Sequence, residues 1–182
     1  MSQEQALLQR DRCLLVVIDA QQRLMPVIHD HQGISDNLER LVRFAGIIQL
    51  PILVTEQQKL GPTLPRLAQH LPGLEPVSKI SFDCFGCPGF VQALEELGRD
   101  TLLLTGVESH ICVAQTALSA RGRYRVQVVS DAVGSRSPHN LQVALQRMRA
   151  AGVEITSTEM LIYELLGRAG SEEFKATLPL VK

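Results

Sequence analysis

The chain has 182 residues, of which 45% are apolar, so we expect a single domain over 1–182 with its core at about 11–168 and a C-terminal arm at 169–182. Its 18 basic and 19 acidic residues leave a net charge of −1, which argues against nucleic acid or an anionic membrane as a partner. Trp is absent and aromatic residues make up 4%, so base-stacking platforms are not expected.

The first half of the chain alternates apolar runs with segments of helical period. In order, these predict a strand at Arg12 to Asp19, a helix at Asp36 to Leu50, a strand at Ile52 to Thr55, a mostly irregular stretch at Gly61 to Pro76 with at most a short helix at Leu64 to His70, and a strand at Val77 to Ile80. The first strand is apolar without interruption from Leu14 to Ile18, so both of its faces are expected to be buried.

The second half continues the same alternation. It predicts a helix at Pro88 to Leu97, a strand at Thr101 to Val107, a helix at Ser109 to Arg121, a strand at Arg125 to Ser130, a helix at Pro138 to Ala151, a strand at Val153 to Thr156, a helix at Glu159 to Leu166 and a short helical tail from Ser171. Strands that alternate with helices favour a parallel sheet with right-handed crossovers, so the expected fold is a doubly wound, Rossmann-like α/β sheet of six strands with helices on both faces.

Cysteine content and the chain's apolar segments indicate the compartment. Cysteines at 13, 84, 87 and 112 are few for a secreted protein held by disulfides. The first residues lack the basic-then-apolar order of a signal peptide, and the longest apolar run, Cys13 to Ile18, is too short to span a bilayer. These features predict a cytoplasmic protein without a membrane partner.

Polar residues that follow the predicted strands are the first candidates for chemistry, because working groups of such sheets lie past the carboxyl ends of the strands. They are Asp19, Glu56, Lys79, the segment Glu108 to Cys112, and Asp131. A carboxylate at the end of a buried strand, such as Asp19, is costly unless it is paired or active. Taken singly, Asp19 could cap a loop and Lys79 could be an ordinary solvated lysine, but together they lie at one sheet edge.

Cys112 is the candidate nucleophile. If Ser109 is the N-cap of the helix that follows, Cys112 lies in the first turn, where unpaired N–H groups favour a thiolate. It shares a helical stripe with Gln115, Thr116 and Ser119, which is a polar face. The alternative is a small buried hydrophobic residue with a packing role.

Three segments resemble the isochorismatase-like cysteine hydrolases. Leu15-Val16-Val17-Ile18-Asp19-Ala20-Gln21 is similar to the first strand of that family, Thr105-Gly106-Val107-Glu108-Ser109-His110-Ile111-Cys112-Val113 resembles its nucleophile loop, and Val128-Val129-Ser130-Asp131-Ala132-Val133 resembles the strand that follows. The resemblance covers about residues 11 to 168, and the nucleophile loop is closest to the isochorismatase domain-containing branch.

The resemblance implies a triad of Asp19, Lys79 and Cys112 on a six-stranded sheet. It also implies a cis peptide at Val107–Glu108, with the backbone N–H groups of Glu108 and Cys112 as an oxyanion hole. In that scheme Lys79 keeps Asp19 ionised and helps to hold Cys112 as a thiolate. The thiolate attacks an acyl or similar carbon of a small amide, ester or related C–N substrate, Asp19 carries the proton, and water then clears the thioester.

One departure from the family concerns metal. Its nicotinamidases place an Asp and two His after the second strand, where this chain reads Glu56-Gln57-Gln58-Lys59-Leu60-Gly61-Pro62, with no His before His70. We therefore expect no metal and no other cofactor, and nicotinamide is disfavoured as the substrate.

The expected partners are a small-molecule substrate and further copies of the same chain. Leu24, Phe82, Phe85, Val107 and His110 are expected to line the substrate pocket. The family suggests self-association, and the apolar tail from Phe174 to Val181 could dock on a partner subunit or on its own domain.

Two other interpretations stay open. Cys84-Phe85-Gly86-Cys87 has the spacing of thiol oxidoreductases, although it follows the third predicted strand rather than the first ones. A catalytically silent scaffold of the same fold is the other alternative. A Ser109, His139 and Asp131 triad has little support, because no Gly-x-Ser-x-Gly elbow is present.

Overall fold

The computed structural model describes residues 7–182 and contains a six-stranded sheet. The strands are β1 (Cys13–Ile18), β2 (Ile52–Gln57), β3 (Val77–Lys79), β4 (Thr101–Val107), β5 (Arg125–Gly134) and β6 (Glu154–Thr156). All the pairings between them are parallel, in the order β3-β2-β1-β4-β5-β6. This order confirms the expected doubly wound fold, whose winding direction reverses between β1 and β4.

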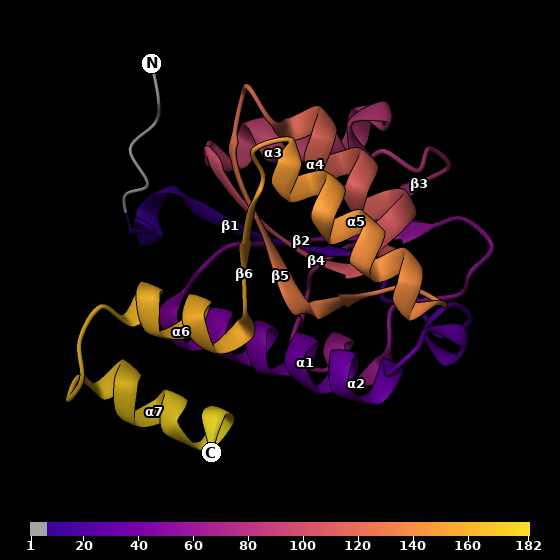
Figure 1. The fold of residues 1–182 in the computed structure, drawn as a ribbon. Coiled ribbons are helices and arrows are strands. Elements are labelled where there is room, and N and C mark those ends of the chain that lie inside the picture. The colour runs from indigo at the N-terminus through magenta and orange to yellow at the C-terminus, as the bar shows by residue number, and fades with distance from the viewer. Residues whose placement is uncertain (1–6) are drawn as a thin grey trace.

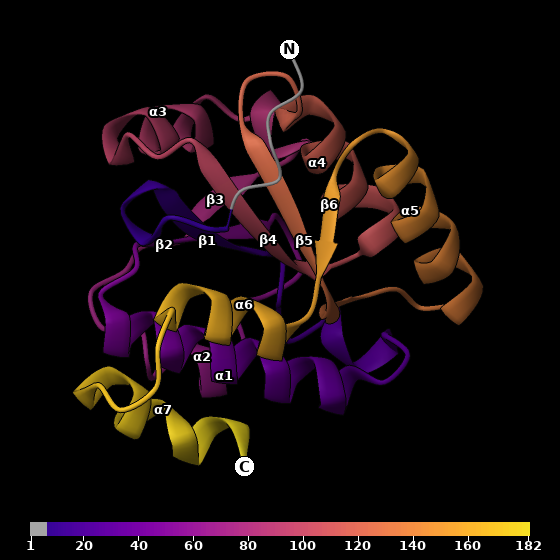
Figure 2. The ribbon, with the colours of Figure 1, turned by 60° about the vertical axis from the view of Figure 1, so that its left-hand side comes forward.

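Helices cover both faces of the sheet (Figures 1 and 2). One face carries α1 (His31–Ile48), α2 (Pro65–Ala68), α6 (Thr158–Leu166) and α7 (Glu172–Val181), and the other carries α3 (Pro88–Leu97), α4 (Ala114–Ala120) and α5 (Pro138–Ala150). Because successive residues of a strand point to opposite faces, Leu15 and Val17 of β1 enter the core under α1, while Leu14, Val16 and Ile18 enter the core under α3 and α4. The uninterrupted apolar pattern of β1 is therefore explained by its packing into a core on each face of the sheet.

The chain that follows β4 differs from the sequence expectation. A continuous helix from Ser109 was expected, but the structure has a wide π-helical turn, η4 (Ser109–Val113), before α4 begins. Ser109 is not an N-cap: Glu108 holds that position without a side-chain capping bond, and Ser109 Oγ is buried without a hydrogen-bond partner. A π-turn is set by its surroundings and often marks a functional site, so local propensity does not reveal it.

Of the remaining elements, α1 and β5 differ most from the expected bounds. Helix α1 begins at His31 rather than Asp36, and β5 continues past Ser130 to Gly134. The pairing of β5 with β4 shifts register between Leu104 and Gly106, so the extra residues stay on the ladder after an irregularity. The carboxyl end of β5 therefore extends beyond Asp131.

The tail docks on its own domain as helix α7. It packs on α1, with Thr177 and Leu180 buried, and Ser171 caps it by accepting a hydrogen bond from the Phe174 N–H. Among the described residues, no helix is both long enough and apolar enough to cross a membrane.

Candidate functional site at the switch point

Asp19 and Lys79 form a fully buried ion pair at the carboxyl edge of the sheet. Asp19 directly follows β1, and Lys79 is the last residue of β3. Lys79 Nζ lies 2.7 Å from Asp19 Oδ2, and both side chains are 0% exposed. Removing one member of such a pair would leave an uncompensated charge in the interior. The structure thus brings together the two charged residues that the sequence placed at one edge.

Neighbouring residues of β2 hold the pair in place. Thr55 Oγ1 donates to Asp19 Oδ1 at 2.8 Å, and Lys79 Nζ donates to Gln57 Oε1 at 2.9 Å and to the Ser81 carbonyl at 3.2 Å. Burial lowers the pKa of Lys79, but the charge and the hydrogen bond of Asp19 outweigh this effect, so that its pKa is raised overall. Lys79 is therefore an ammonium at neutral pH.

Asp19 takes a backbone conformation that is uncommon for a residue with a side chain. Its φ is 52°, in the left-handed region, where Asp is better tolerated than most residues. Its N–H donates to the Thr55 carbonyl at 3.1 Å. This conformation ends β1 and turns the chain at the switch point.

Cys112 lies in the π-turn after β4 and is 6% exposed. Burial raises the pKa of its thiol to about 12. The charge of Asp19 and a hydrogen bond to it act in the same direction, whereas Lys79 lowers the pKa. This corrects the sequence expectation of a stabilised thiolate, because burial and Asp19 outweigh the ammonium. At neutral pH, Cys112 is a neutral thiol hydrogen-bonded to a carboxylate.

The turn between β4 and Cys112 has a cis peptide at Val107–Glu108, as the family resemblance implied. The Glu108 side chain is 7% exposed, and its Oε1 lies 2.9 Å from Arg136 Nε. His110, two residues on, has Nδ1 3.0 Å from Ser135 Oγ. Sequence reasoning did not find Arg136 or Ser135, which lie beyond the point where β5 was expected to end.

The five expected pocket residues differ in their surroundings. Val107 is fully buried, Leu24 is partly buried against the core under α1, Phe82 is 53% exposed, and His110 is 22% exposed through its side chain. Phe85 packs against Phe90 and Tyr124 with ring centroids 5.5 and 5.8 Å apart. Phe85 thus belongs to an aromatic cluster with Phe90 of α3 and Tyr124, which precedes β5.

The Cys-x-x-Cys motif lacks the properties of a redox pair. Cys84 is fully buried, and burial raises the pKa of its thiol to about 11. Reactive thiols of such motifs have a lowered pKa and an accessible sulfur. The Cys84 N–H donates to Thr116 Oγ1 at 3.1 Å, and Cys84 and Cys87 are both free thiols. The motif thus packs the segment before α3 against α4.

The end of β2 and the segment that follows it do not fit the metal site of the nicotinamidases. Glu56 Oε1 accepts hydrogen bonds from the N–H and the hydroxyl of Thr63 at 2.6 and 2.7 Å, and Gln57 is bound to Lys79. His70 lies 3.2 Å from Glu39 of α1. Within residues 7–182, no group of three or more His, Cys, Asp or Glu side chains is arranged to hold a metal ion.

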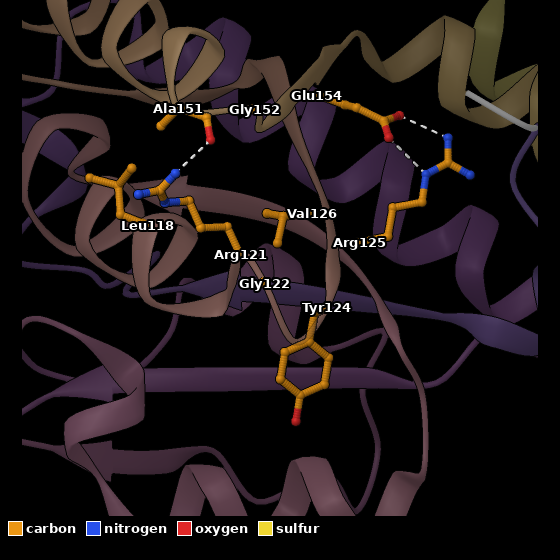
Figure 3. Close-up of a pocket in the computed structure, with 9 residues that line it drawn as sticks. All are labelled: Leu118, Arg121, Gly122, Tyr124, Arg125, Val126, Ala151, Gly152 and Glu154. Atoms are coloured by element: carbon orange, nitrogen blue, oxygen red, sulfur yellow. Dashed lines mark hydrogen bonds and ion pairs between the residues drawn. The ribbon is translucent and has the colours of Figure 1, made fainter. Parts of the chain in front are cut away.

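Asp131 and one surface cavity both lie outside the charged site. Asp131 Oδ1 accepts from the N–H and hydroxyl of Thr158 at 2.8 and 2.9 Å, so it caps α6 rather than joining a serine triad. A cavity of about 450 Å³ is lined by residues that include Arg121, Arg125 and Glu154, which are drawn in Figure 3. Arg125 and Glu154 begin their strands, so this cavity opens at the edge opposite Asp19.

The fold and the site define a class of protein: a doubly wound α/β domain that gathers a carboxylate, an ammonium and a thiol at its topological switch point. The chain belongs to the isochorismatase family, because residues 13–160 match the Isochorismatase domain. Isochorismatase domain-containing protein 2 of Bos taurus is 37% identical over 173 residues, which cover 93% of this chain and 82% of that protein.

Solved structures show the same fold over almost the whole chain. The MAR1 ribonuclease of Caenorhabditis elegans has a TM-score of 0.89 and 32% identity, and the match covers 97% of this chain and 92% of that one. YcaC of Pseudomonas aeruginosa, with hexane-2,5-diol and covalent acrylamide, has a TM-score of 0.91, 26% identity and coverage of 98% and 93%. The ycaC product of Escherichia coli, described as an octameric hydrolase of unknown specificity, has a TM-score of 0.86, 25% identity and coverage of 92% and 85%.

Proposed function

We propose that the protein is a cysteine hydrolase that cleaves a small amide, ester or related C–N substrate through a covalent intermediate on Cys112. The observation that supports this most is the buried ion pair of Lys79 Nζ and Asp19 Oδ2, which lie 2.7 Å apart, with the Cys112 thiol hydrogen-bonded to the same carboxylate. An ion pair inside a protein is costly to build, and here it lies beside a nucleophile at the switch point.

The attack begins from the neutral thiol. As Cys112 sulfur forms a bond to the substrate carbonyl carbon, Asp19 accepts the thiol proton, so that a thiolate is never exposed at equilibrium. The carbonyl π electrons move to the oxygen, which the backbone N–H groups of Glu108 and Cys112 are proposed to stabilise. Lys79 holds Asp19 in place through this step and compensates its charge.

The leaving group departs with the proton that Asp19 received. When the tetrahedral oxyanion collapses, the C–N or C–O bond breaks and the protonated Asp19 donates to the departing nitrogen or oxygen. Water then attacks the thioester, Asp19 accepts a proton from it, and the Cys112 sulfur leaves and recovers a proton. The scheme needs only the residues of the chain and water.

We also infer that the protein assembles into a homo-oligomer, as the octameric Escherichia coli relative does. Ile80 is 72% exposed and Phe82 is 53% exposed, just after β3. These apolar side chains flank an edge strand of the sheet, where a second copy could cover them. Cytoplasmic location stays a prediction from the sequence.

A panel of small amides and esters tests the reaction, with mass spectrometry of the trapped protein. We expect hydrolysis with an acyl adduct on Cys112, loss of at least about a hundredfold in kcat in Cys112→Ala, and full activity in Cys84→Ala and Cys87→Ala. A short RNA oligomer belongs in the same panel, because one structural relative is named a ribonuclease. Cleavage of RNA that survives Cys112→Ala, or adducts confined to Cys84 or Cys87, would contradict the proposal.

A further inference from the structure

Glu108 carries a buried carboxylate that the proposed reaction does not use. The residue is 5% exposed, and the mechanism draws only on its backbone N–H. Burying a carboxylate costs free energy unless partners replace its hydration. The side chain therefore needs a role of its own.

The main partner of this carboxylate is Arg136, which lies between β5 and α5. Arg136 Nε lies 2.9 Å from Glu108 Oε1, and the Arg136 backbone N–H donates to Oε2 at 3.5 Å. The Arg136 side chain is 58% exposed, against 7% for Glu108. A guanidinium at the surface thus holds a carboxylate that lies in the interior.

His110 ties the same turn to the same loop. Its Nδ1 lies 3.0 Å from Ser135 Oγ and 3.6 Å from Glu108 Oε2, and its Nε2 lies 3.3 Å from Asn140 Nδ2. With the Asn140 amide donating to Nε2, Nδ1 carries the proton and donates to Ser135 or Glu108. The residues on both sides of Ser109 are therefore bound to the segment after β5.

That segment is itself well anchored. Gly134, the last residue of β5, pairs with Val107 in the sheet, and Ser135 is 2% exposed. The Ser135 carbonyl accepts a hydrogen bond from the His29 N–H at 3.0 Å. The segment can thus serve as a fixed support for the turn before Cys112.

We propose that Arg136 is a positioning residue for the oxyanion site, an inference that rests on the proposed function. By holding the Glu108 carboxylate, Arg136 fixes the orientation of the Glu108 peptide, whose N–H donates a hydrogen bond to the developing oxyanion. Hydrogen bonds weaken steeply when the donor is misaligned, so loosening this peptide reduces stabilisation of the tetrahedral species. The Cys112, Asp19 and Lys79 chemistry does not depend on the contact.

Two reagents separate these contributions on the intact chain. Acetaldehyde labelled with ¹³C at its carbonyl adds to the Cys112 thiol: the sulfur bonds to carbon, and the thiol proton ends on the oxygen that occupies the oxyanion site. Iodoacetamide alkylates the same sulfur by displacing iodide and develops no charge on a carbonyl oxygen at the reacting carbon. The first reagent reports on the oxyanion site, and the second reports on the thiol alone.

In Arg136→Ala we expect the aldehyde affinity to fall about tenfold, while the iodoacetamide rate stays within about twofold. Arg136→Lys restores part of the affinity, because an ammonium can hold the carboxylate at one point. Glu108→Gln should lower the aldehyde affinity as much as Arg136→Ala does. The double variant should lose no more affinity than either single variant, as expected for two residues that act as a unit. Arg12→Ala, which breaks the exposed pair with Asp100 at the other end of the sheet, is the matched control and leaves both reagents unaffected.

Three results would overturn the inference: unchanged aldehyde affinity in Arg136→Ala, an equal loss for both reagents, or a loss that Glu108→Gln does not share. The last would mean that Arg136 contacts the ligand directly. If Arg136→Ala fails to fold, Arg136→Lys and Glu108→Gln carry the comparison. Failure of the proposed function looks different, because the wild-type protein would then give no adduct that Cys112→Ala removes.

Discussion

At the scale of single residues, the electrostatics of the site are set by burial as much as by partners. Lys79 stays charged because Asp19 compensates the cost of burying it, whereas Cys112 lies beside the same carboxylate and keeps its proton. A thiol that is neutral at rest is protected from alkylation and oxidation, since the thiolate is the reactive form. In the proposed reaction, the thiol is activated only when a substrate is bound and Asp19 accepts the proton.

This arrangement predicts opposite effects of Asp19→Asn on two reactions of Cys112. The substitution removes the negative charge that, together with burial, raises the pKa of the thiol, so this pKa falls from about 12. We expect iodoacetamide to alkylate Cys112 faster than in the wild type at any pH below that value, whereas hydrolysis falls at least about a hundredfold without the proton acceptor. The measurement is the alkylation rate at Cys112 as a function of pH, resolved by peptide mass spectrometry.

Asp100→Asn is the matched control for that experiment, because Asp100 pairs with Arg12 at the opposite end of the sheet. Asp100→Asn should leave the pKa of the Cys112 thiol unchanged. Slower alkylation in Asp19→Asn would show that Asp19 already draws the proton from the resting thiol, and the neutral starting state would be wrong.

The sequence pointed to Asp19, Lys79 and Cys112 as candidate site residues but not to their protonation. Asp19 and Lys79 could be placed at one edge because each follows a short apolar run, and the resemblance of the nucleophile loop added Cys112. The raised pKa of the thiol could not be predicted, because it depends on how completely the π-turn is buried. Thr55, Gln57 and Arg136 were missed for a related reason: an ordinary polar residue near a strand end gives no signal until its partner is known.

At the scale of elements, the close approach of β4 to β1 positions the site. Gly106 pairs with Ile18 in the sheet, one residue before Asp19, and has φ of 101°. A Cβ at this position would lie 2.0 Å from the Ile18 carbonyl oxygen and 2.6 Å from its nitrogen. Only glycine lets the two strands meet there, and their ends carry Asp19 and the turn to Cys112.

Gly106→Ala should therefore disrupt the sheet where it supports the chemistry. We expect the free energy of unfolding to fall by about 3 kcal/mol or more, because both the contact and the backbone conformation are unfavourable. Urea unfolding measures the change. Gly46→Ala in α1, where a Cβ meets nothing within 4 Å, is the matched control and should raise stability by about 0.5–1 kcal/mol. Similar stabilities for the two variants would contradict this account of β4 and β1.

Elements with strong periodicity were predictable, and those shaped by tertiary contacts were not. β4 and α3 have the bounds that their sequences indicated, Thr101–Val107 and Pro88–Leu97. The π-turn after β4 was read as ordinary helix, because its residues have no distinctive pattern and its wide winding depends on its neighbours. The extension of β5 to Gly134 follows an irregularity in its pairing with β4. Such an irregularity depends on both strands and cannot be predicted from the sequence of one strand.

At the scale of the whole molecule, both edges of the sheet expose apolar side chains. Beyond β3 lie Ile80 and Phe82, and beside β6 lie Met160 and Tyr163 of α6, which are 61% and 41% exposed. The tail does not cover either edge, since α7 packs on α1. Exposed apolar side chains beside an unpaired strand favour association with another chain.

The β3 edge is the interface that we expect in a homo-oligomer, because the exposed Ile80 and Phe82 flank Ser81, whose carbonyl accepts a hydrogen bond from Lys79. Light scattering should give a mass that is a multiple of 20.1 kDa for the wild-type protein. Ile80→Arg should lower that mass toward the single chain, because an arginine is costly to bury against an apolar partner surface. Met160→Arg, at the other edge, is the matched control and should leave the mass unchanged. A wild-type mass of 20.1 kDa would contradict the oligomer itself, and dissociation by Met160→Arg alone would move the interface to β6 and α6.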